Sequence, residues 1–472
     1  MKAGTIGRAM KVSTINPATE QIIAEYDVMS QKKVNEIVEN SRLAFVDWRK
    51  DIHTRIELIH RFADELRKNR KGLALVASKE MGKPIKEAVS EIEKCAWVME
   101  YYGDNGQVFM NDEVLNTDAR KTLITFQPFG VIASIMPWNF PYWQVLRFAA
   151  PSMTIGNTLV LKPASATLQC GIEIEKLFNK VGFPNGVFQT LLGNSTVAEH
   201  LLDSPEIDAV TFTGSTSVGS KVAQRAGSHL KKCVLELGGS DPFIVCDDAD
   251  VEKATEGAVK GRFINCGQSC IASKRFLVEK KIANEFIEKF VQKTERLKVG
   301  NPLSDDTDIG PLVNYKGLET IEDQVKDAKD NNAEILTGGN RVGDKGYYFK
   351  PTIIKNISNK MRIYHEETFG PVASIIVVND EKDAIKIANE SSFGLGASVW
   401  TKDLDKAEKI SRAIDSGMVS VNNMLVSDPR VPFGGIKQSG FGRELSKYGM
   451  LEFVNIKSIR FYDQLLHHHH VE

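Results

Sequence analysis

Along most of the first hundred residues, hydrophobic positions recur every three or four residues, which predicts helices. Gly82 and Pro84 interrupt this pattern, and a further helix is predicted over residues 87–101. The alternating segment 121–127 predicts a strand instead. The clearest helix is predicted over residues 54–69, where one apolar stripe consists of Ile56, Ile59, Phe62, Ala63 and Leu66.

From residue 130 onward, short β-rich runs alternate with helical segments. Such alternation is typical of βαβ units and predicts an α/β fold with mostly parallel sheets. A second series of the same kind begins after Asp241, so a domain boundary is predicted near Ser240. The predicted strands are 131–136, 158–161, 187–192, 209–212 and 234–237 in the first series, and 243–246, 275–278, 374–378 and 397–400 in the second. The predicted helices of the first series include 169–181, 197–202 and 218–225.

The composition favours a protein that acts on small molecules. Lys and Arg total 60 and Asp and Glu total 61, a net charge of -1 that argues against a nucleic-acid binder or a polybasic membrane-surface protein. Six cysteines without a C-x-x-C pair indicate neither a disulfide scaffold nor structural zinc, so no metal site is expected. Because neither an apolar signal segment nor a run of about 18 apolar residues occurs, we expect a soluble, cytoplasmic protein. The histidine run at 467–470 is left out of the fold prediction.

Two predicted strand ends are suited to holding a phosphate group. Lys162 ends an apolar run, and ligands bind at the carboxyl ends of parallel strands. The segment 211–219 (TFTGSTSVG) passes from a strand through Gly214 into a helix, whose N-terminal N–H groups attract anions. Taken alone, these features equally fit a solvated lysine and a bare structural turn.

Three further residues have side chains of the kinds used in covalent catalysis. Cys270 follows a turn at Gly267, where a thiol beside free backbone N–H groups can be an activated nucleophile. Glu236 lies in an apolar strand, where desolvation raises the pKa of a carboxyl group and suits a general base. Asn139, held between two prolines, offers a rigid amide to an oxyanion. The alternatives are an inert buried thiol, a core glutamate in an ion pair and a structural asparagine.

These candidates occur together, and their motifs resemble the aldehyde dehydrogenase superfamily over nearly the full length. So many motifs in the family's order make a chance match negligible. The matching motifs are MGKP (81–84), PWNFP (137–141), KPA (162–164), FTGST (212–216), ELGG (236–239), N-x-GQ-x-C (265–270), EETFGPV (366–372), PFGG (432–435) and SGFGRE (439–444).

The resemblance implies an α/β architecture in three parts and a homodimer or homotetramer. We expect a Rossmann-like cofactor-binding domain at 1–112 and 131–240, and a catalytic domain at 241–430. A small β oligomerisation element with the C-terminal segment is expected at 113–130 and 431–466, followed by a tail at 467–472.

The resemblance also implies the catalytic roles. Cys270 is expected to attack the aldehyde carbonyl, with Asn139 and the Cys270 backbone N–H holding the oxyanion. Glu236 is expected to activate the water that hydrolyses the thioester. Cys266, four residues before Cys270, raises the further possibility of a redox cross-link, although both residues would have to reposition.

The implied cofactor is NADP, with NAD also possible. Family members restricted to NAD usually carry a glutamate where this chain has Ser165, and its absence removes a repulsion from the 2′-phosphate. A serine that merely tolerates both cofactors is the alternative. The residues expected around the cofactor are Trp138, Lys162, Ser165, Gly214, Ser215, Gly219, Glu367 and Phe369.

For the substrate, the resemblance is strongest to the succinate-semialdehyde branch of the family. Arg147 is expected to bind the distal carboxylate, Ser427 to donate a hydrogen bond, and Arg430 to replace a second arginine that this branch often carries where Ile264 stands here. Surface salt bridges are the alternative for both arginines. Malonate, glutarate or broad aliphatic aldehydes remain possible substrates, and acyl-CoA formation, a cysteine-dependent amidase or nitrilase and a non-catalytic relative are the competing functions.

Overall fold

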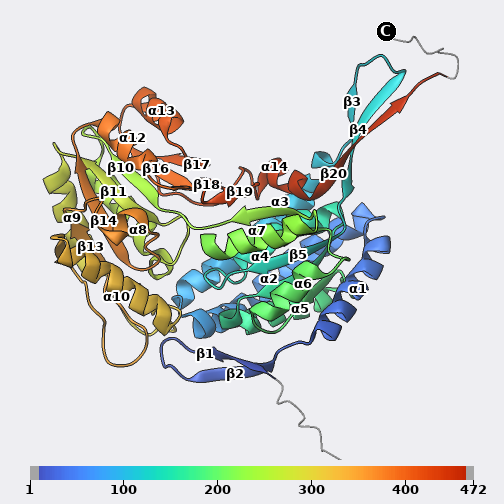
Figure 1. The fold of residues 1–472 in the computed structure, drawn as a ribbon, viewed down its shortest axis with the longest axis horizontal. Helices are drawn as coiled ribbons and strands as arrows, with labels where there is room; N and C mark the ends of the chain where they lie inside the picture. Colours follow the sequence, from blue (N-terminus) through green and yellow to red (C-terminus); the bar gives the residue numbers. More distant parts are fainter. Residues whose placement is uncertain (1–9, 464–472) are drawn as a thin grey trace, which may run out of the picture.

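The computed structural model describes residues 10–463 and consists mainly of two α/β units and a projecting β-sheet (Figure 1). The α/β fold expected from the sequence is confirmed, including its mostly parallel sheets. No helix among the described residues is both long enough and apolar enough to cross a membrane.

The first large sheet has the strand order β19-β9-β8-β5-β6-β7. Helices pack on both of its faces. Neighbouring residues of a strand point to opposite faces of the sheet, so each face contributes apolar side chains to a separate core. Ile132 belongs to the core formed with α2, α3, α4 and α5, and Val131 to the core formed with α1, α6 and α7. Only β19 runs antiparallel to its neighbour. The strands are β5 (Val131–Met136), β6 (Thr158–Pro163), β7 (Phe188–Thr190), β8 (Ala209–Thr213), β9 (Lys232–Glu236) and β19 (Gly440–Phe441). The helices are α1 (Gln31–Trp48), α2 (Ile52–Met81), α3 (Ile85–Phe109), α4 (Trp143–Ile155), α5 (Leu168–Val181), α6 (Ser195–Asp203) and α7 (Thr216–Ser228).

The predicted helices and strands of this part are confirmed, with large differences in length at two helices. The helix predicted over residues 87–101 extends over Ile85–Phe109. The helix predicted over residues 54–69 begins at Ile52, where Asp51 accepts hydrogen bonds from the first turn, and continues to Met81. The buried stripe extends through Leu73, Ala74 and Ala77, so the helix continues to pack on the core beyond the predicted end.

The second large sheet has the order β12-β13-β14-β11-β10-β16-β17, and all its pairs are parallel except β12 with β13. Its two faces pack against α8, α9 and α10 on one side and α12 and α13 on the other. The strands are β10 (Asp241–Val245), β11 (Ser273–Glu279), β12 (Glu334–Thr337), β13 (Thr352–Lys355), β14 (Val372–Val378), β16 (Gly396–Trp400) and β17 (Met418–Val421). The helices are α8 (Val251–Phe263), α9 (Ala283–Glu295), α10 (Tyr315–Asp330), α11 (Arg362–His365), α12 (Glu381–Asn389) and α13 (Leu404–Ala413).

A three-stranded antiparallel sheet projects from the body of the molecule, as Figure 1 shows. It contains β3 (Glu113–Leu115), the predicted strand β4 (Lys121–Pro128) and β20 (Val454–Phe461), and a short helix α14 (Ser446–Met450) precedes β20. Two small pairs complete the fold: β1 (Lys11–Ile15) with β2 (Ile22–Asp27), and β15 (Phe393–Gly394) with β18 (Ile436–Lys437). The exact domain boundaries stay a prediction, and the histidine run lies outside the described residues.

Candidate active site

Cys270 follows a sharp turn between α8 and β11. The backbone there is left-handed at Asn265, Cys266 and Gly267, with φ values of 53°, 57° and 70°. Residues with side chains rarely adopt this conformation. A Cβ on Gly267 would also lie 2.2 Å from the carbonyl oxygen of Gly370, so this position requires glycine.

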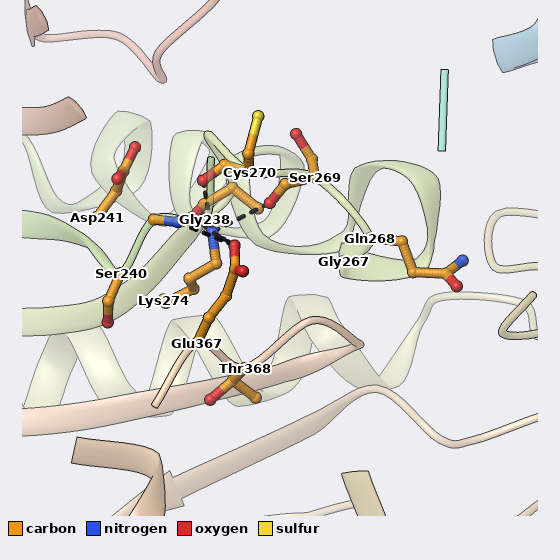
Figure 2. A network of polar contacts seen from close by, with 12 residues as sticks. Gly238, Ser240, Asp241, Gly267, Gln268, Ser269, Cys270, Lys274, Glu367 and Thr368 are labelled. Carbon is orange, nitrogen blue, oxygen red and sulfur yellow. Dashed lines mark hydrogen bonds and ion pairs between the residues drawn. The ribbon is translucent and has the colours of Figure 1, made fainter. Parts of the chain in front are cut away.

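A buried lysine holds the backbone on both sides of the cysteine. The ammonium of Lys274 donates hydrogen bonds to the carbonyl oxygens of Ser269, Cys270 and Ala272 at 3.0, 2.6 and 3.1 Å. It also lies 3.5 Å from a carboxylate oxygen of Glu367. Figure 2 shows the sulfur of Cys270 pointing away from this lysine–glutamate pair. The pair therefore fixes the main chain of the turn through its carbonyl oxygens and does not engage the thiol group.

The structure brings Asn139 to the same turn. Its side-chain amide nitrogen donates to the backbone carbonyl of Gln268 at 3.1 Å, and its backbone carbonyl accepts from the side chain of Asn265 at 2.8 Å. Because an amide nitrogen has two N–H groups, one remains for another acceptor. Asn139 is only 4% exposed, so its position beside the cysteine turn is well defined by packing.

The ionisable groups around the thiol are strongly desolvated. Burial raises the pKa of Cys270 to about 12, although the cations of Arg147 and Lys274 oppose the shift. Glu236 is 2% exposed, and neither of its carboxylate oxygens has a hydrogen-bond partner among the described residues. Burial, followed by the nearby Glu444 carboxylate, raises the pKa of Glu236 well above its usual range. Such a carboxyl group is suited to exchange protons as a general base.

A cavity of about 850 Å³ lies in front of Cys270. Residues of α3 and α4, the cysteine turn and the segment 424–427 line it, and both Arg147 and Ser427 are among them. Arg147 is 1% exposed, forms an ion pair with Glu444, and lies 4.4 Å from the ring centre of Phe433. The Glu444 carboxylate thus compensates the charge of this arginine.

Arg430 differs from its predicted position. Its side chain is 67% exposed, pairs with Asp428 at 2.6 Å and is not part of the cavity lining. The reason is local: a carboxylate two residues earlier holds the guanidinium at the surface in a bidentate pair. The expectation that Arg430 supplies a second positive charge to the substrate site is therefore corrected.

Sequence reasoning missed two charged residues near the cysteine. Lys94 of α3 lines the cavity, and its ammonium donates to the hydroxyl of Ser427 at 2.7 Å. Glu444, paired with Arg147, was noted only as part of a motif. The spacing of Glu87, Glu91 and Lys94 places a polar stripe on one face of a helix, but such a stripe usually faces solvent.

The predicted cofactor residues of the first sheet lie at the carboxyl ends of its strands. Lys162 near the end of β6 is 5% exposed, and burial lowers its pKa to about 8. Ser165 begins a short 3₁₀ helix directly after this strand, and its hydroxyl donates to the carbonyl of Gly193 at 3.3 Å. Gly214 and Ser215 follow β8, and Ser215 forms no capping side-chain bond to α7. An uncapped helix end and a buried lysine fit a phosphate-bearing cofactor.

Gly219 has a packing function in this structure. Its N–H donates to the carbonyl of Ser215 within α7, and a Cβ would lie 2.3 Å from the side chain of Leu237. Gly219 therefore lets α7 approach the strand end, and its N–H is not available to a pyrophosphate. That Gly219 lies against the pyrophosphate stays a prediction.

Of the predicted nicotinamide residues, Glu367 lies next to Lys274, which holds the cysteine turn. The carboxylate of Glu367 accepts from the backbone N–H of Gly239 at 3.0 Å, and Trp138 packs edge-on against Phe369 with ring centres 5.7 Å apart. Cys266 is 1% exposed and, like Cys270, is a free thiol. A redox cross-link between them stays a prediction.

Comparisons with known proteins agree with this geometry. The family model described as "Aldehyde dehydrogenase family" matches residues 6–459. A protein of Synechocystis sp. named probable succinate-semialdehyde dehydrogenase [NADP(+)] is 44% identical over 451 residues, which cover 95% of this chain and 99% of the relative. Succinate-semialdehyde dehydrogenase [NADP(+)] 1 of Mycobacterium tuberculosis is 41% identical over 454 residues, with the same coverage. The crystal structure of succinic semialdehyde dehydrogenase from Streptococcus pyogenes in complex with NADP+ is similar with a TM-score of 0.94 and 35% identity, over 96% of this chain and 100% of that one.

Proposed function

The chain belongs to the aldehyde dehydrogenase family, and we propose that it oxidises succinate semialdehyde to succinate with NADP+ as cofactor. The observation that carries this proposal is the cavity, in which the thiol of Cys270 and the buried cation of Arg147 share one enclosure. A short aldehyde with a distal carboxylate matches both groups. The names of the similar Synechocystis and Mycobacterium proteins support the same substrate and cofactor.

In the first step, Cys270 attacks the carbonyl carbon of the aldehyde. The thiol proton passes to a base, for which Glu236 is our candidate, and the S–C bond forms as the carbonyl electron pair moves to oxygen. The free N–H of the Asn139 amide and the backbone N–H of Cys270 stabilise this oxyanion. When bound, NADP+ supplies an acceptor for the hydride that leaves the same carbon.

In the second step, water hydrolyses the resulting thioester. Glu236 first releases to solvent the proton that it took from the thiol. It then removes a proton from the water, the new C–O bond forms, and the S–C bond to Cys270 breaks. Because burial and Glu444 raise the pKa of Glu236, this carboxylate takes up the water proton more readily than an exposed glutamate does. It then returns the proton to the departing thiolate. Lys274 keeps the turn in place through its three carbonyl contacts.

The same reasoning assigns the cofactor contacts. We propose that the first turn of α7 and Ser215 hold the pyrophosphate, that Glu367 and Phe369 face the nicotinamide part, and that Trp138 lines the same region. Ser165 and Lys162 lie where a 2′-phosphate meets no carboxylate side chain at position 165. That arrangement favours NADP+ over NAD+.

An aldehyde panel tests the proposal. The purified protein is assayed with succinate, malonate and glutarate semialdehydes, propanal and benzaldehyde, each with NADP+ and with NAD+, and the reduced nicotinamide is followed by absorbance. We expect the highest kcat/KM for succinate semialdehyde with NADP+. Equal values for all five aldehydes would refute the assignment of the substrate, and no reduction with any aldehyde would favour the amidase or nitrilase alternative.

We also propose that the projecting sheet mediates homo-oligomer formation. Val114, Ile456 and Phe461 expose 73%, 57% and 46% of their surface. β20 is an edge strand, because it pairs only with β4 among the described residues, and a free edge readily pairs with another chain. Light scattering coupled to gel filtration distinguishes a dimer or tetramer from a monomer, and a monomer would refute this proposal.

A further inference from the structure

The cavity holds a lysine whose charge the described residues leave uncompensated. Lys94 lies on the face of α3 that lines the cavity. Its neighbouring carboxylates are already engaged: Glu91 pairs with buried Lys83, and Asp428 pairs with Arg430. Within residues 10–463, the polar contact of the Lys94 ammonium is therefore the hydroxyl of Ser427 and not a carboxylate.

Two contacts fix the position of this ammonium. The hydrogen bond to Ser427 measures 2.7 Å, and the face of the Trp143 ring lies beneath the ammonium, 4.4 Å away at its centre. The ring and the hydroxyl do not exhaust the three N–H groups of an ammonium. Because Ser427 accepts a hydrogen bond from Lys94, its own O–H is left to donate. The two side chains thus present adjacent donors to the cavity.

The charge of Arg147 is compensated, whereas that of Lys94 is not. Arg147 forms a buried ion pair with Glu444, although its second terminal nitrogen has no hydrogen-bond partner. Arg147 can therefore orient an incoming carboxylate through a hydrogen bond, but its positive charge is already balanced by Glu444. Lys94 supplies the net charge that a carboxylate needs on leaving water.

We propose that Lys94, together with the hydroxyl of Ser427, binds the distal carboxylate of the substrate and determines the preference for carboxy-aldehydes. This inference rests on the proposed function and deepens it, because it names the cation that selects the substrate. Arg147, which lines the same cavity, then contributes its unpartnered N–H.

The electrostatic surroundings of Lys94 predict a pH signature. Burial, and after it Arg147 on α4, lowers the pKa of Lys94 to about 8, while Cys95 and Glu91 on α3 and Asp428 in the segment carrying Ser427 oppose that shift. Above about pH 8, the free enzyme loses this charge. The KM for succinate semialdehyde therefore rises, whereas the KM for butanal, which has no carboxylate, does not rise with it. Glu87 also lines the cavity and has a pKa raised by burial to about 7, but its influence persists when Lys94 is replaced.

The test compares Lys94→Met and Lys94→Gln with Lys86→Met. Lys86 lies on the same helix and also borders the cavity, but it is 46% exposed and paired with Asp308 at 2.7 Å. For each protein, the ratio of kcat/KM for succinate semialdehyde to kcat/KM for butanal is measured across a range of pH values. We expect both Lys94 variants to lower this ratio about 10- to 100-fold, as the loss of a charged hydrogen bond does, and to abolish its fall above about pH 8. Lys86→Met should keep the wild-type ratio.

Two results would overturn the inference: a wild-type ratio in folded Lys94 variants, or an equal loss in Lys86→Met, which would indicate a general effect of charge. If both Lys94 variants fail to fold, the wild-type enzyme alone provides the test. The inference is then overturned if its ratio of kcat/KM values stays constant between neutral pH and pH values well above 8. The proposed function fails separately, when the wild-type enzyme itself shows no preference for succinate semialdehyde over butanal.

Discussion

Replacing Lys274 with methionine tests whether the cysteine turn depends on its buried ammonium. The substitution keeps most of the side-chain volume but removes hydrogen bonds to three carbonyl oxygens and leaves the Glu367 carboxylate without its cation. A hydrogen bond to a charged group contributes about 1.5–3 kcal/mol, and breaking a buried ion pair costs about 3–5 kcal/mol. Since these contributions are not additive, we expect a loss of about 3–5 kcal/mol in the free energy of unfolding.

The effect on catalysis should exceed the effect on folding. The Lys274 cation lowers the pKa of Cys270, so its removal raises that pKa and decreases the thiolate fraction at a given pH; one pKa unit corresponds to about tenfold. Displacement of the turn adds a further loss, since a misplacement of about 1 Å can cost about 100-fold in rate. We therefore expect kcat/KM to fall by about 100- to 1,000-fold.

A second buried lysine provides the matched control. Lys231 is 8% exposed and donates to the carbonyls of Leu202 and Ser204, at the end of β9 opposite to Glu236. Lys231→Met should also lose stability, without altering the reaction of Cys270. The assays are thermal or denaturant unfolding and the rate of Cys270 alkylation by iodoacetamide, followed on the Cys270 peptide by mass spectrometry. Normal alkylation and turnover in Lys274→Met would refute the reasoning, as would an equal loss of alkylation in Lys231→Met.

Three other substitutions test individual roles. Glu236→Gln should stop thioester hydrolysis, so that a covalent acyl adduct on Cys270 accumulates in the mass spectrum; because the pKa of Glu236 is raised, wild-type hydrolysis should slow as the pH falls through that pKa and the carboxylate becomes protonated. Ser165→Glu should lower kcat/KM with NADP+ by about 100-fold, since it places a carboxylate against the 2′-phosphate, and change it little with NAD+; equal losses with both cofactors would contradict the assignment. Arg430→Ala should change kcat/KM for succinate semialdehyde by less than about threefold, because its ion pair is at the surface, and a tenfold rise in KM would return it to the substrate site.

The two large sheets were predictable because their central strands are covered on both faces. Such strands appear in the sequence as short apolar runs, as in β5, β6 and β8, which are buried along almost their whole length. β20 lacks this signal: seven of its eight residues are at least partly exposed, so no apolar run or alternation reveals it. Its identity as a strand depends on pairing with β4, which lies far away in the sequence.

The catalytic residues were predictable from local motifs, whereas the charges around them were not. Spacing from Asn139 placed Arg147 on a helix near the site, and the cavity includes it. Its partner Glu444 belongs to a distant segment, and only the tertiary structure joins them. For Arg430, the sequence prediction placed the side chain in the substrate site, whereas the structure places it in an ion pair outside the cavity. Its partner Asp428 is only two residues away in the sequence. A polar stripe on α3 gave no indication of which of its residues face a cavity and which face water.

The placement of these charges addresses a conflict between the two catalytic groups. A cation near Cys270 stabilises the thiolate, but the same cation lowers the pKa of Glu236 and weakens it as a base. Arg147 acts on both groups in this way. Glu444 acts in the opposite direction on Glu236, where its carboxylate is the largest cause of the raised pKa after burial, whereas it is not among the leading influences on Cys270. The Arg147–Glu444 pair therefore moves the two pKa values toward each other, because Arg147 lowers that of Cys270 while Glu444 raises that of Glu236 by more than Arg147 lowers it. Neither charge alone has this effect, which accounts for a buried ion pair beside a site that already contains buried Lys274.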